Sequence, residues 1–178
     1  MTNESLRLVE PSLELVTAFV DFVADHRQAG EERYADLAAQ ADVEAYVRRC
    51  QEEAQGLNLA PGIVPQTTYW LVQGDFILGE SRLRHELTPA LEREGGNIGC
   101  IIRPSKRRKG YGTLILALTL AEARRRGMSR VCVTVDADNT ASTRVIEKNA
   151  GSLPGQAVSG ESGKVVSQYW IEFTSQER

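Results

Sequence analysis

The chain has 178 residues, 42% of them hydrophobic, and a formal net charge of −3 at pH 7, so we expect one globular domain over residues 1–178. Three widely separated cysteines without C-x-x-C spacing argue against a disulfide framework or a zinc site, and we expect no metal. Because no apolar segment is long enough to be a signal peptide or a membrane span, we expect a cytoplasmic protein that does not bind membranes.

The first half of the chain predicts two helices followed by a three-stranded meander. Apolar residues recur at helical spacing in the two helical segments, and the strand segments are rich in β-branched and aromatic residues. The expected helices cover residues 11–26 and 42–55, and the expected strands cover 67–72, 76–84 and 97–103. Gly74 and Asp75 predict a tight turn between the first two strands.

The second half predicts helix, strand, helix and strand. A helix over residues 110–126 ends at Gly127, and it is expected to bury a stripe made of Leu114, Ile115, Leu118 and Ala121. The remaining segments are a strand over 130–135, a helix that begins within 136–142, a glycine-rich hairpin loop over 151–163 and a last strand over 165–173. We expect the last strand to be an edge strand, which makes a homodimer plausible.

The most informative segment is Arg107-Arg-Lys-Gly-Tyr-Gly112, which follows an expected strand and opens an expected helix. In this arrangement successive backbone N–H groups and a helix N-terminus face one point, which is a site for phosphate. Five cations among the seven residues 103–109 raise the local potential. The segment is not a Walker loop, and a dinucleotide fingerprint would need glycine or alanine where Ile115 stands.

This segment, Arg-x-x-Gly-x-Gly, resembles the acetyl-CoA pyrophosphate loop of the GNAT (GCN5-related) N-acetyltransferases. The strand and Asn139-x-x-Ser142 that follow the expected helix complete an order similar to the GNAT core over residues 97–151. Residues 64–72, 83–87 and 146–149 are similar to a subgroup of small bacterial predicted acetyltransferases, so the resemblance covers most of the chain.

The resemblance implies an α/β (α+β) fold with a mixed, mostly antiparallel central sheet flanked by helices and a splayed parallel strand pair that binds CoA. It also implies acetyl-CoA as acyl donor and direct attack on its thioester by a primary amine of a small molecule or peptide. The residues that it implies for cofactor binding are Cys100, Ile101, Ile102, Arg103, Arg107, Arg108, Lys109, Gly110, Tyr111, Gly112, Thr113, Asn139 and Ser142.

The catalytic residues are less defined, because two groups that many GNAT enzymes use are missing. The expected strand over 97–103 contains no Glu, and the position four residues after Ser142 is Ile146 where many members have Tyr. His85 is the first candidate for the general base because a neutral imidazole has a suitable pKa, although a histidine hydrogen-bonded within the fold is an open alternative. The other candidate bases are Glu80, Glu31, Glu32 and Glu86, and the candidate acids are Tyr169 and Tyr111.

Two other functions stay open at this stage. The missing Glu and Tyr suit a non-catalytic acyl-CoA-binding or sensing domain. The basic run before Gly110 also suits nucleic-acid binding, but the negative net charge and the two glycines directly after the run favour a nucleotide cofactor, so we expect no nucleic-acid partner.

Overall fold

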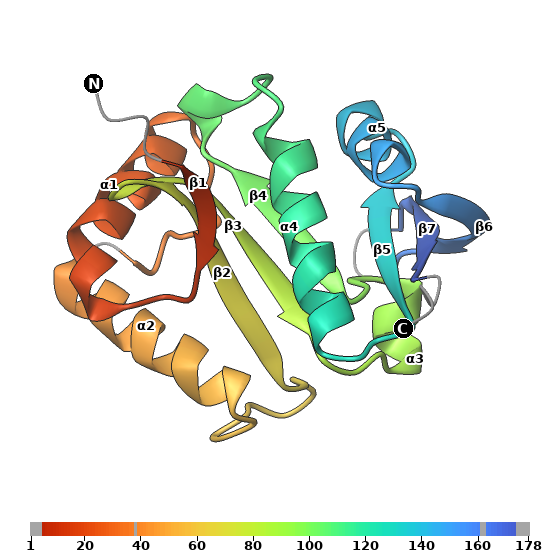
Figure 1. The fold of residues 1–178 in the computed structure, drawn as a ribbon, viewed down its shortest axis with the longest axis horizontal. Helices are drawn as coiled ribbons and strands as arrows, with labels where there is room; N and C mark the ends of the chain where they lie inside the picture. The colour runs from red at the N-terminus through yellow and green to blue at the C-terminus, as the bar shows by residue number, and fades with distance from the viewer. Residues whose placement is uncertain (1–4, 38, 161–162, 174–178) are drawn as a thin grey trace.

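The computed structural model describes residues 5–37, 39–160 and 163–173, which form two β-sheets with helices packed around them (Figure 1). The elements in chain order are β1 (Leu6–Val9), the 3-10 helix η1 (Leu13–Leu15), α1 (Val16–Gln28), α2 (Gln40–Ala54), β2 (Gln66–Gln73), β3 (Phe76–Arg84), α3 (Pro89–Arg93), β4 (Ile98–Ile102), the 3-10 helix η2 (Pro104–Lys106), α4 (Tyr111–Arg125), β5 (Arg130–Asp136), α5 (Thr140–Lys148), β6 (Ser152–Val158) and β7 (Val165–Glu172).

The strands form a four-stranded sheet in the order β1-β2-β3-β4 and a three-stranded sheet in the order β5-β7-β6. Every ladder within the two sheets is antiparallel. Strand β2 is buried along nearly its whole length, because helices cover both faces of the four-stranded sheet. A strand buried on both faces has no polar alternation, which is why β2 is an almost continuous run of buried side chains.

Helices α1 and α2 cover one face of the four-stranded sheet, and α4 covers the other (Figure 1). Neighbouring residues of β2 point to opposite faces, so Trp70 packs against α1 and α2 while Leu71 packs with Ile115 of α4. The rings of Phe19 and Trp70 stack with their centroids 4.5 Å apart. Helix α4 also packs on the second sheet, where Leu116 and Leu120 contact the cluster that contains Val131, and so it joins the two sheets.

No ladder joins β4 to β5 among the described residues, although both strands run in the same direction in Figure 1. They are linked at their start by Asn97, whose backbone N–H donates to the Cys132 carbonyl over 2.7 Å. The Asn97 side chain completes the link, because its Oδ1 accepts from the Cys132 N–H over 2.8 Å. Beyond this point the strands diverge, and the ends of β4 and β5 belong to different sheets.

The predicted helices and strands up to residue 148 are present within a few residues of their expected bounds, and β1 and α3 are two further elements that were not predicted. The predicted loop over 151–163 is wrong, since residues 152–158 form β6. Pro and Gly within this segment hide its strand character, and the pairing with β7 shifts register between Ser152 and Gly155. As a result β7 lies in the middle of its sheet and is not the expected edge strand.

The predicted buried stripe of α4 is rotated. Ile115 is fully buried as expected, but Leu114 and Leu118 are partly buried and Ala121 is exposed. The buried positions that complete the stripe are Leu116, Thr119, Leu120 and Ala123. The helix contacts both sheets, so its buried face is wider than the single stripe that the sequence predicts.

No helix in the described ranges is both long and apolar enough to cross a bilayer.

Replacing the Asn97 side chain should weaken the link between β4 and β5, because it removes the acceptor for the Cys132 N–H while the backbone bond from Asn97 N–H to the Cys132 carbonyl stays. We expect Asn97→Ala to lower the free energy of unfolding by about 2–3 kcal/mol, because the buried Cys132 N–H loses its acceptor. Urea unfolding followed by circular dichroism measures this loss, and Asn97→Asp should also be destabilised, because a carboxylate oxygen would replace the Nδ2 donor that faces the Arg84 carbonyl. A change below about 0.5 kcal/mol in the alanine variant would contradict a structural role for this link.

Candidate active site

The segment between β4 and α4 turns sharply into the helix. Arg108 has φ 63° and Gly110 has φ 86°, so both lie in the left-handed region, which only glycine adopts without strain. Gly110 is the N-cap of α4, and no side chain caps this helix end. The N–H groups of the first helical turn therefore lack a partner within the helix and are free to bind an anion.

Helix α5 packs beside the start of α4, and its C-cap Asn149 donates from Nδ2 to the Thr113 carbonyl over 3.3 Å. Asn139 caps α5 with its side-chain oxygen, which accepts from the Ser142 N–H over 3.1 Å. The two helices approach closely at Gly112, where a Cβ would lie 3.3 Å from Cγ2 of Val145. This contact gives the second glycine of the motif a packing role in addition to its place in the loop.

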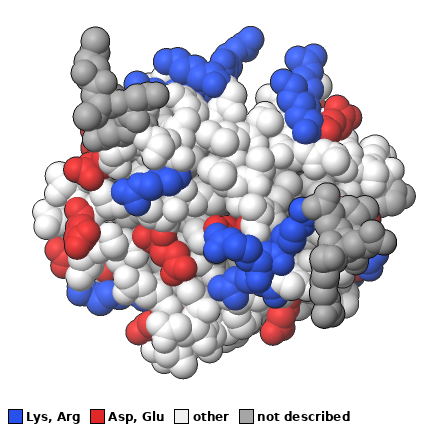
Figure 2. Space-filling view, viewed as in Figure 1, with Lys and Arg blue, Asp and Glu red and all other residues white. Residues whose placement is uncertain are grey.

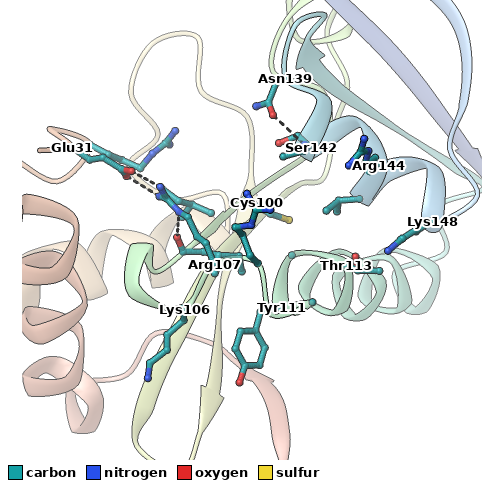
Figure 3. Close-up of a pocket in the computed structure, with 18 residues that line it drawn as sticks. Glu31, Cys100, Lys106, Arg107, Tyr111, Thr113, Asn139, Ser142, Arg144 and Lys148 are labelled. Carbon is teal, nitrogen blue, oxygen red and sulfur yellow. Dashed lines mark hydrogen bonds and ion pairs between the residues drawn. The ribbon is translucent and has the colours of Figure 1, made fainter. Parts of the chain in front are cut away.

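A cavity of about 720 Å³ lies between the end of β4 and the starts of α4 and α5 (Figure 3). Its lining consists of Glu31, Arg33, Cys100, Ile101, Ile102, Lys106, Arg107, Arg108, Gly110, Tyr111, Gly112, Thr113, Asn139, Ala141, Ser142, Arg144, Val145 and Lys148. The structure thus brings together all the residues predicted for cofactor binding except Arg103 and Lys109. The volume suits a ligand larger than a simple anion.

Cations surround this cavity. Figure 2 shows Lys and Arg side chains projecting on both sides of a notch at the top edge of the molecule, above the start of α4 and above α5. Sequence analysis did not assign Arg33, Lys106, Arg144 or Lys148 to the site. Arg144 and Lys148 follow Ala141 at helical spacing, so the period of α5 was the signal that could have located them.

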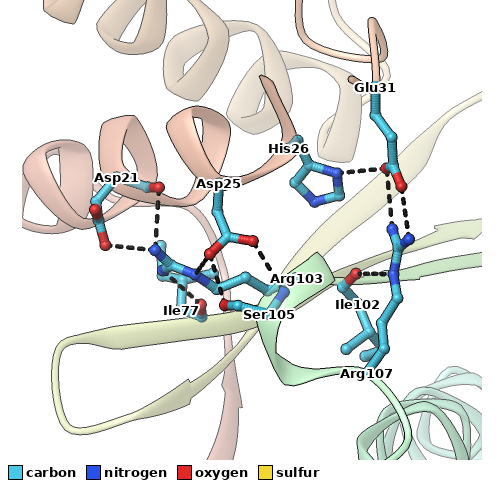
Figure 4. Close-up of polar contacts among 9 residues, drawn as sticks. All are labelled: Asp21, Asp25, His26, Glu31, Ile77, Ile102, Arg103, Ser105 and Arg107. Atoms are coloured by element: carbon cyan, nitrogen blue, oxygen red, sulfur yellow. Dashed lines mark hydrogen bonds and ion pairs between the residues drawn. The ribbon is translucent and has the colours of Figure 1, made fainter. Parts of the chain in front are cut away.

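Arg103 is the predicted cofactor residue whose side chain points away from the cavity and toward α1 (Figure 4). It donates from Nη2 to Asp21 Oδ2 over 2.6 Å and from Nε to Asp25 Oδ2 over 3.1 Å. Asp25 also accepts from the Ser105 hydroxyl over 2.6 Å. Burial alone would raise the pKa of Asp25, but the hydrogen bonds from Ser105 and Arg103 lower it. Arg103 therefore links α1 to the segment that precedes the predicted phosphate-binding loop, residues 107–113, which is called the phosphate loop below.

Arg107 makes a second link to the same part of the fold. Its Nη1 and Nη2 donate to the two carboxylate oxygens of Glu31 over 2.6 and 2.9 Å. Glu31 follows α1, and its Oε2 lies 2.8 Å from Nδ1 of the buried His26. The hydrogen bonds from Arg107 outweigh burial and lower the pKa of Glu31 to about 2. Burial lowers the pKa of His26, although Glu31 opposes this effect.

The candidate base His85 lies at the far end of β3 from the phosphate loop. Leu83 pairs with Ile98 at the start of β4, whereas the cavity is lined by the end of β4, so residue 85 is beyond the opposite end. Its Nε2 lies 2.9 Å from the Thr67 hydroxyl, which also accepts from Arg126. Burial and Arg126 lower the pKa of His85. The structure supports the alternative of a histidine hydrogen-bonded within the fold.

Among the other catalytic candidates, Glu31 and Tyr111 line the cavity, whereas Glu80 and Tyr169 are outside its lining. Glu80 is buried beneath α2, where its carboxylate accepts from Tyr34, Tyr46 and Trp70 over 3.1, 2.8 and 3.1 Å. Tyr169 is buried in the core beside the three-stranded sheet and pairs with Val133 of β5.

No group of three His, Cys, Asp or Glu side chains within the described ranges is arranged to hold a metal ion.

Comparison with known proteins identifies the class that this fold and site define. Residues 5–151 match the family model described as "Acetyltransferase (GNAT) domain". This match covers most of the chain, so the chain belongs to the GNAT acetyltransferase family. The predicted GNAT fold and membership of an acetyltransferase family are thereby confirmed. A search of curated proteins found no match.

Solved structures with the same fold have low sequence identity. RimL, a ribosomal L7/L12 alpha-N-protein acetyltransferase in complex with coenzyme A, has a TM-score of 0.73 at 17% identity, over 97% of this chain and 96% of RimL. The microcin C7 self-immunity acetyltransferase MccE, in complex with acetyl-CoA and AMP, has a TM-score of 0.74 at 14% identity, over 96% and 94% of the two chains. The putative acetyltransferase yncA from Salmonella typhimurium, with its cofactor acetyl-CoA, has a TM-score of 0.64 at 12% identity, over 97% and 96%.

The lowered pKa of Glu31 predicts a pH-dependent contribution to stability. Its carboxylate has an ordinary pKa of 4.5 and a folded value of about 2, so the unfolded chain takes up the proton first as the pH falls. The stability that Glu31 supplies is complete above pH 4.5 and is lost as the pH falls toward 2. Urea unfolding of the wild type and Glu31→Gln should therefore differ most above pH 4.5 and converge at lower pH. Parallel curves would contradict the assigned pKa.

Proposed function

We propose that the cavity between β4, α4 and α5 is the acetyl-CoA site of an N-acetyltransferase that acts on a primary amine of a small molecule or peptide. One observation carries the proposal. The uncapped N-terminus of α4, the end of β4 and a ring of cations converge on one cavity of about 720 Å³. Free N–H groups and cations suit a pyrophosphate, and an exposed strand edge suits an extended amide-containing arm.

The residues that line the cavity fit the parts of this cofactor. In the proposal the amides from Arg108 to Thr113 bind the pyrophosphate, and Arg108, Arg144 and Lys148 supply positive charge. Among the described strands none pairs with β4 on the side of β5, so the backbone of Cys100 and Ile101 is open there to bind the pantetheine arm, while the Ile102 carbonyl already accepts from Arg107 Nε over 3.0 Å. Asn139 and Ser142 border the arm, with the Asn139 oxygen already used as the helix cap.

In the proposed reaction the amine nitrogen would form a bond to the acetyl carbon and lose one proton, while the carbon–sulfur bond breaks and the leaving CoA sulfur takes up one proton. Direct transfer needs both reactants held in line, and a cavity that places them together supplies much of the rate. The acceptor, a cytoplasmic location and a homodimer stay predictions. Strand β6, and not β7, is the edge strand at this side of the sheet, and Leu153 and Val158 on it are 50% and 67% exposed. In a homodimer we propose that a second copy would pair with β6.

The alternative of nucleic-acid binding has less support than cofactor binding, because part of the positive charge of residues 103–109 is paired within the protein. Asp21, Asp25 and Glu31 pair with Arg103 and Arg107 within the protein, so two of the five cations of the basic run are already neutralised. A phosphate backbone binds through cations that are free on the surface.

Arg108 and Lys109 are adjacent cations of the loop, but only Arg108 lines the cavity. We expect Arg108→Gln to weaken acetyl-CoA binding about tenfold, which corresponds to one charge-assisted hydrogen bond, and Lys109→Gln to change it less than about threefold. Isothermal titration of acetyl-CoA into the two variants measures both values under identical salt. Equal losses would mean that general charge, and not the cavity, holds the cofactor.

Release of CoA with a panel of primary amines tests the reaction itself. We expect a thiol reagent to detect CoA release that depends on both an amine and the wild-type protein, and mass spectrometry to show the acetylated amine. Saturating acetyl-CoA at about 100 times Kd should stabilise the fold by about 2.7 kcal/mol, so a thermal shift checks binding separately. Binding without transfer to any small amine or N-terminal peptide would favour the sensing function.

A further inference from the structure

Arg107 opens the loop motif and lines the cavity, yet its guanidinium is directed at the protein (Figure 4). Nη1 and Nη2 form a two-point contact with the Glu31 carboxylate over 2.6 and 2.9 Å, and Nε donates to the Ile102 carbonyl over 3.0 Å. Each nitrogen of the guanidinium thus has a protein acceptor. Fork-to-fork pairing of this kind fixes direction as well as distance.

Glu31 lies on a wall shared by two cavities. Besides the large cavity, it lines a smaller one of about 230 Å³ whose other lining residues are Val23, Arg27, Gly30, Glu32, Tyr34 and Ala35. Among the described residues, Glu31 is the one that lines both. The smaller cavity is built almost entirely by the end of α1 and the segment over residues 30–35, so the position of that segment decides its shape.

The far side of Glu31 is held by the core. Its backbone N–H donates to the His26 carbonyl over 3.0 Å, and its Oε2 lies 2.8 Å from His26 Nδ1. A carboxylate only accepts, so the buried ring donates from Nδ1. Tyr34, three residues on, packs its ring against His26 and donates to the buried Glu80 over 3.1 Å. The segment is thus tied to the core at His26 and Glu80, and to the phosphate loop at Arg107.

We propose that Arg107 is a positioning residue, which acts through Glu31 to hold the segment over residues 30–35 against the phosphate loop, and that it is not a ligand of the pyrophosphate. The inference rests on the proposed function and deepens it: Glu31 forms the wall between the large cavity and the smaller one that this segment shapes, and the proposal assigns the smaller cavity to the acceptor amine. In this proposal the phosphate is bound by Arg108 and not by Arg107. Arg108 also lines the cavity, and the Glu31 carboxylate is paired with Arg107 and not with Arg108.

The test compares Arg107→Gln, Glu31→Gln, the double variant and Arg108→Gln. Titration with CoA should give Kd values for Arg107→Gln and Glu31→Gln within about threefold of the wild type, against about tenfold for Arg108→Gln. Hydrogen exchange of amides 30–35 should accelerate to the same extent in Arg107→Gln, Glu31→Gln and the double variant, because each removes the same link. With an amine that supports CoA release, both single variants should raise KM for the amine more than KM for acetyl-CoA.

A tenfold or larger loss of CoA affinity in Arg107→Gln, with unchanged exchange at residues 30–35, would overturn the inference and make Arg107 a phosphate ligand. Additive effects of the two single variants on exchange would also overturn it. If the wild type itself fails to bind CoA, the proposed function fails instead, and the two failures are distinguished by this one measurement. The charge-exchanged pair Arg107→Glu with Glu31→Arg should recover slow exchange if the pairing is what matters, and Arg107→Glu alone should not.

Discussion

The site depends on one constraint, the parting of β4 from β5 after Asn97. Two strands that continued side by side would satisfy each other's backbone groups and leave no room between them. Instead Asn97 joins them once through its backbone and once through its side chain, and none of the described strands pairs with the β4 backbone beyond it on that side. Gly96 allows this contact, because a Cβ there would lie 2.5 Å from the Cys132 carbonyl oxygen. The gap that follows is widened by α4 and α5, whose N-termini face into it (Figure 3).

The phosphate loop needs support of its own, because a segment with left-handed Arg108 and Gly110 gains little from regular structure. Two arginines four residues apart provide it. Arg103 binds Asp21 and Asp25 on α1, and Arg107 binds Glu31 just beyond α1. The largely buried Arg103 has good geometry to both carboxylates, while the pairing of Arg107 is more exposed and fixes direction more than it adds stability. The first helix thus covers the sheet and also holds the loop that faces the cofactor cavity.

Most of the residues that line the cavity could be predicted from sequence because they are local and have a fixed spacing. Glycines, cations and Asn139-x-x-Ser142 follow strands and open helices, so knowing the order of elements suffices to bring them together. The exceptions have physical reasons. The Arg103 side chain lies outside the cavity because it pairs with Asp21 and Asp25 on α1. These partners are 82 and 78 positions away in the sequence, so no local pattern predicts the contacts. Lys109 does not line the cavity although both of its neighbours do, and these neighbours have a left-handed backbone conformation that cation spacing alone does not show.

The candidate catalytic residues could not be placed in the same way, because they were chosen by chemistry and not by spacing. Glu80 and Ile101 face each other across β3 and β4, so sequence analysis placed Glu80 in the right strand. The sequence does not show that three distant side chains donate hydrogen bonds to that carboxylate: Tyr34 from the segment between α1 and α2, Tyr46 from α2 and Trp70 from β2. The strand β6 was missed because its pairing with the next strand, β7, overrides the local preference of Pro and Gly.

The most direct test of the account is a crystal structure of the protein with bound CoA. The account predicts density for the pyrophosphate at the amides from Arg108 to Thr113, pantetheine along Cys100 to Ile102, and an intact Arg107–Glu31 pair on the other side of the loop. CoA bound elsewhere, or β4 and β5 closed into one continuous ladder with no cavity between them, would contradict it.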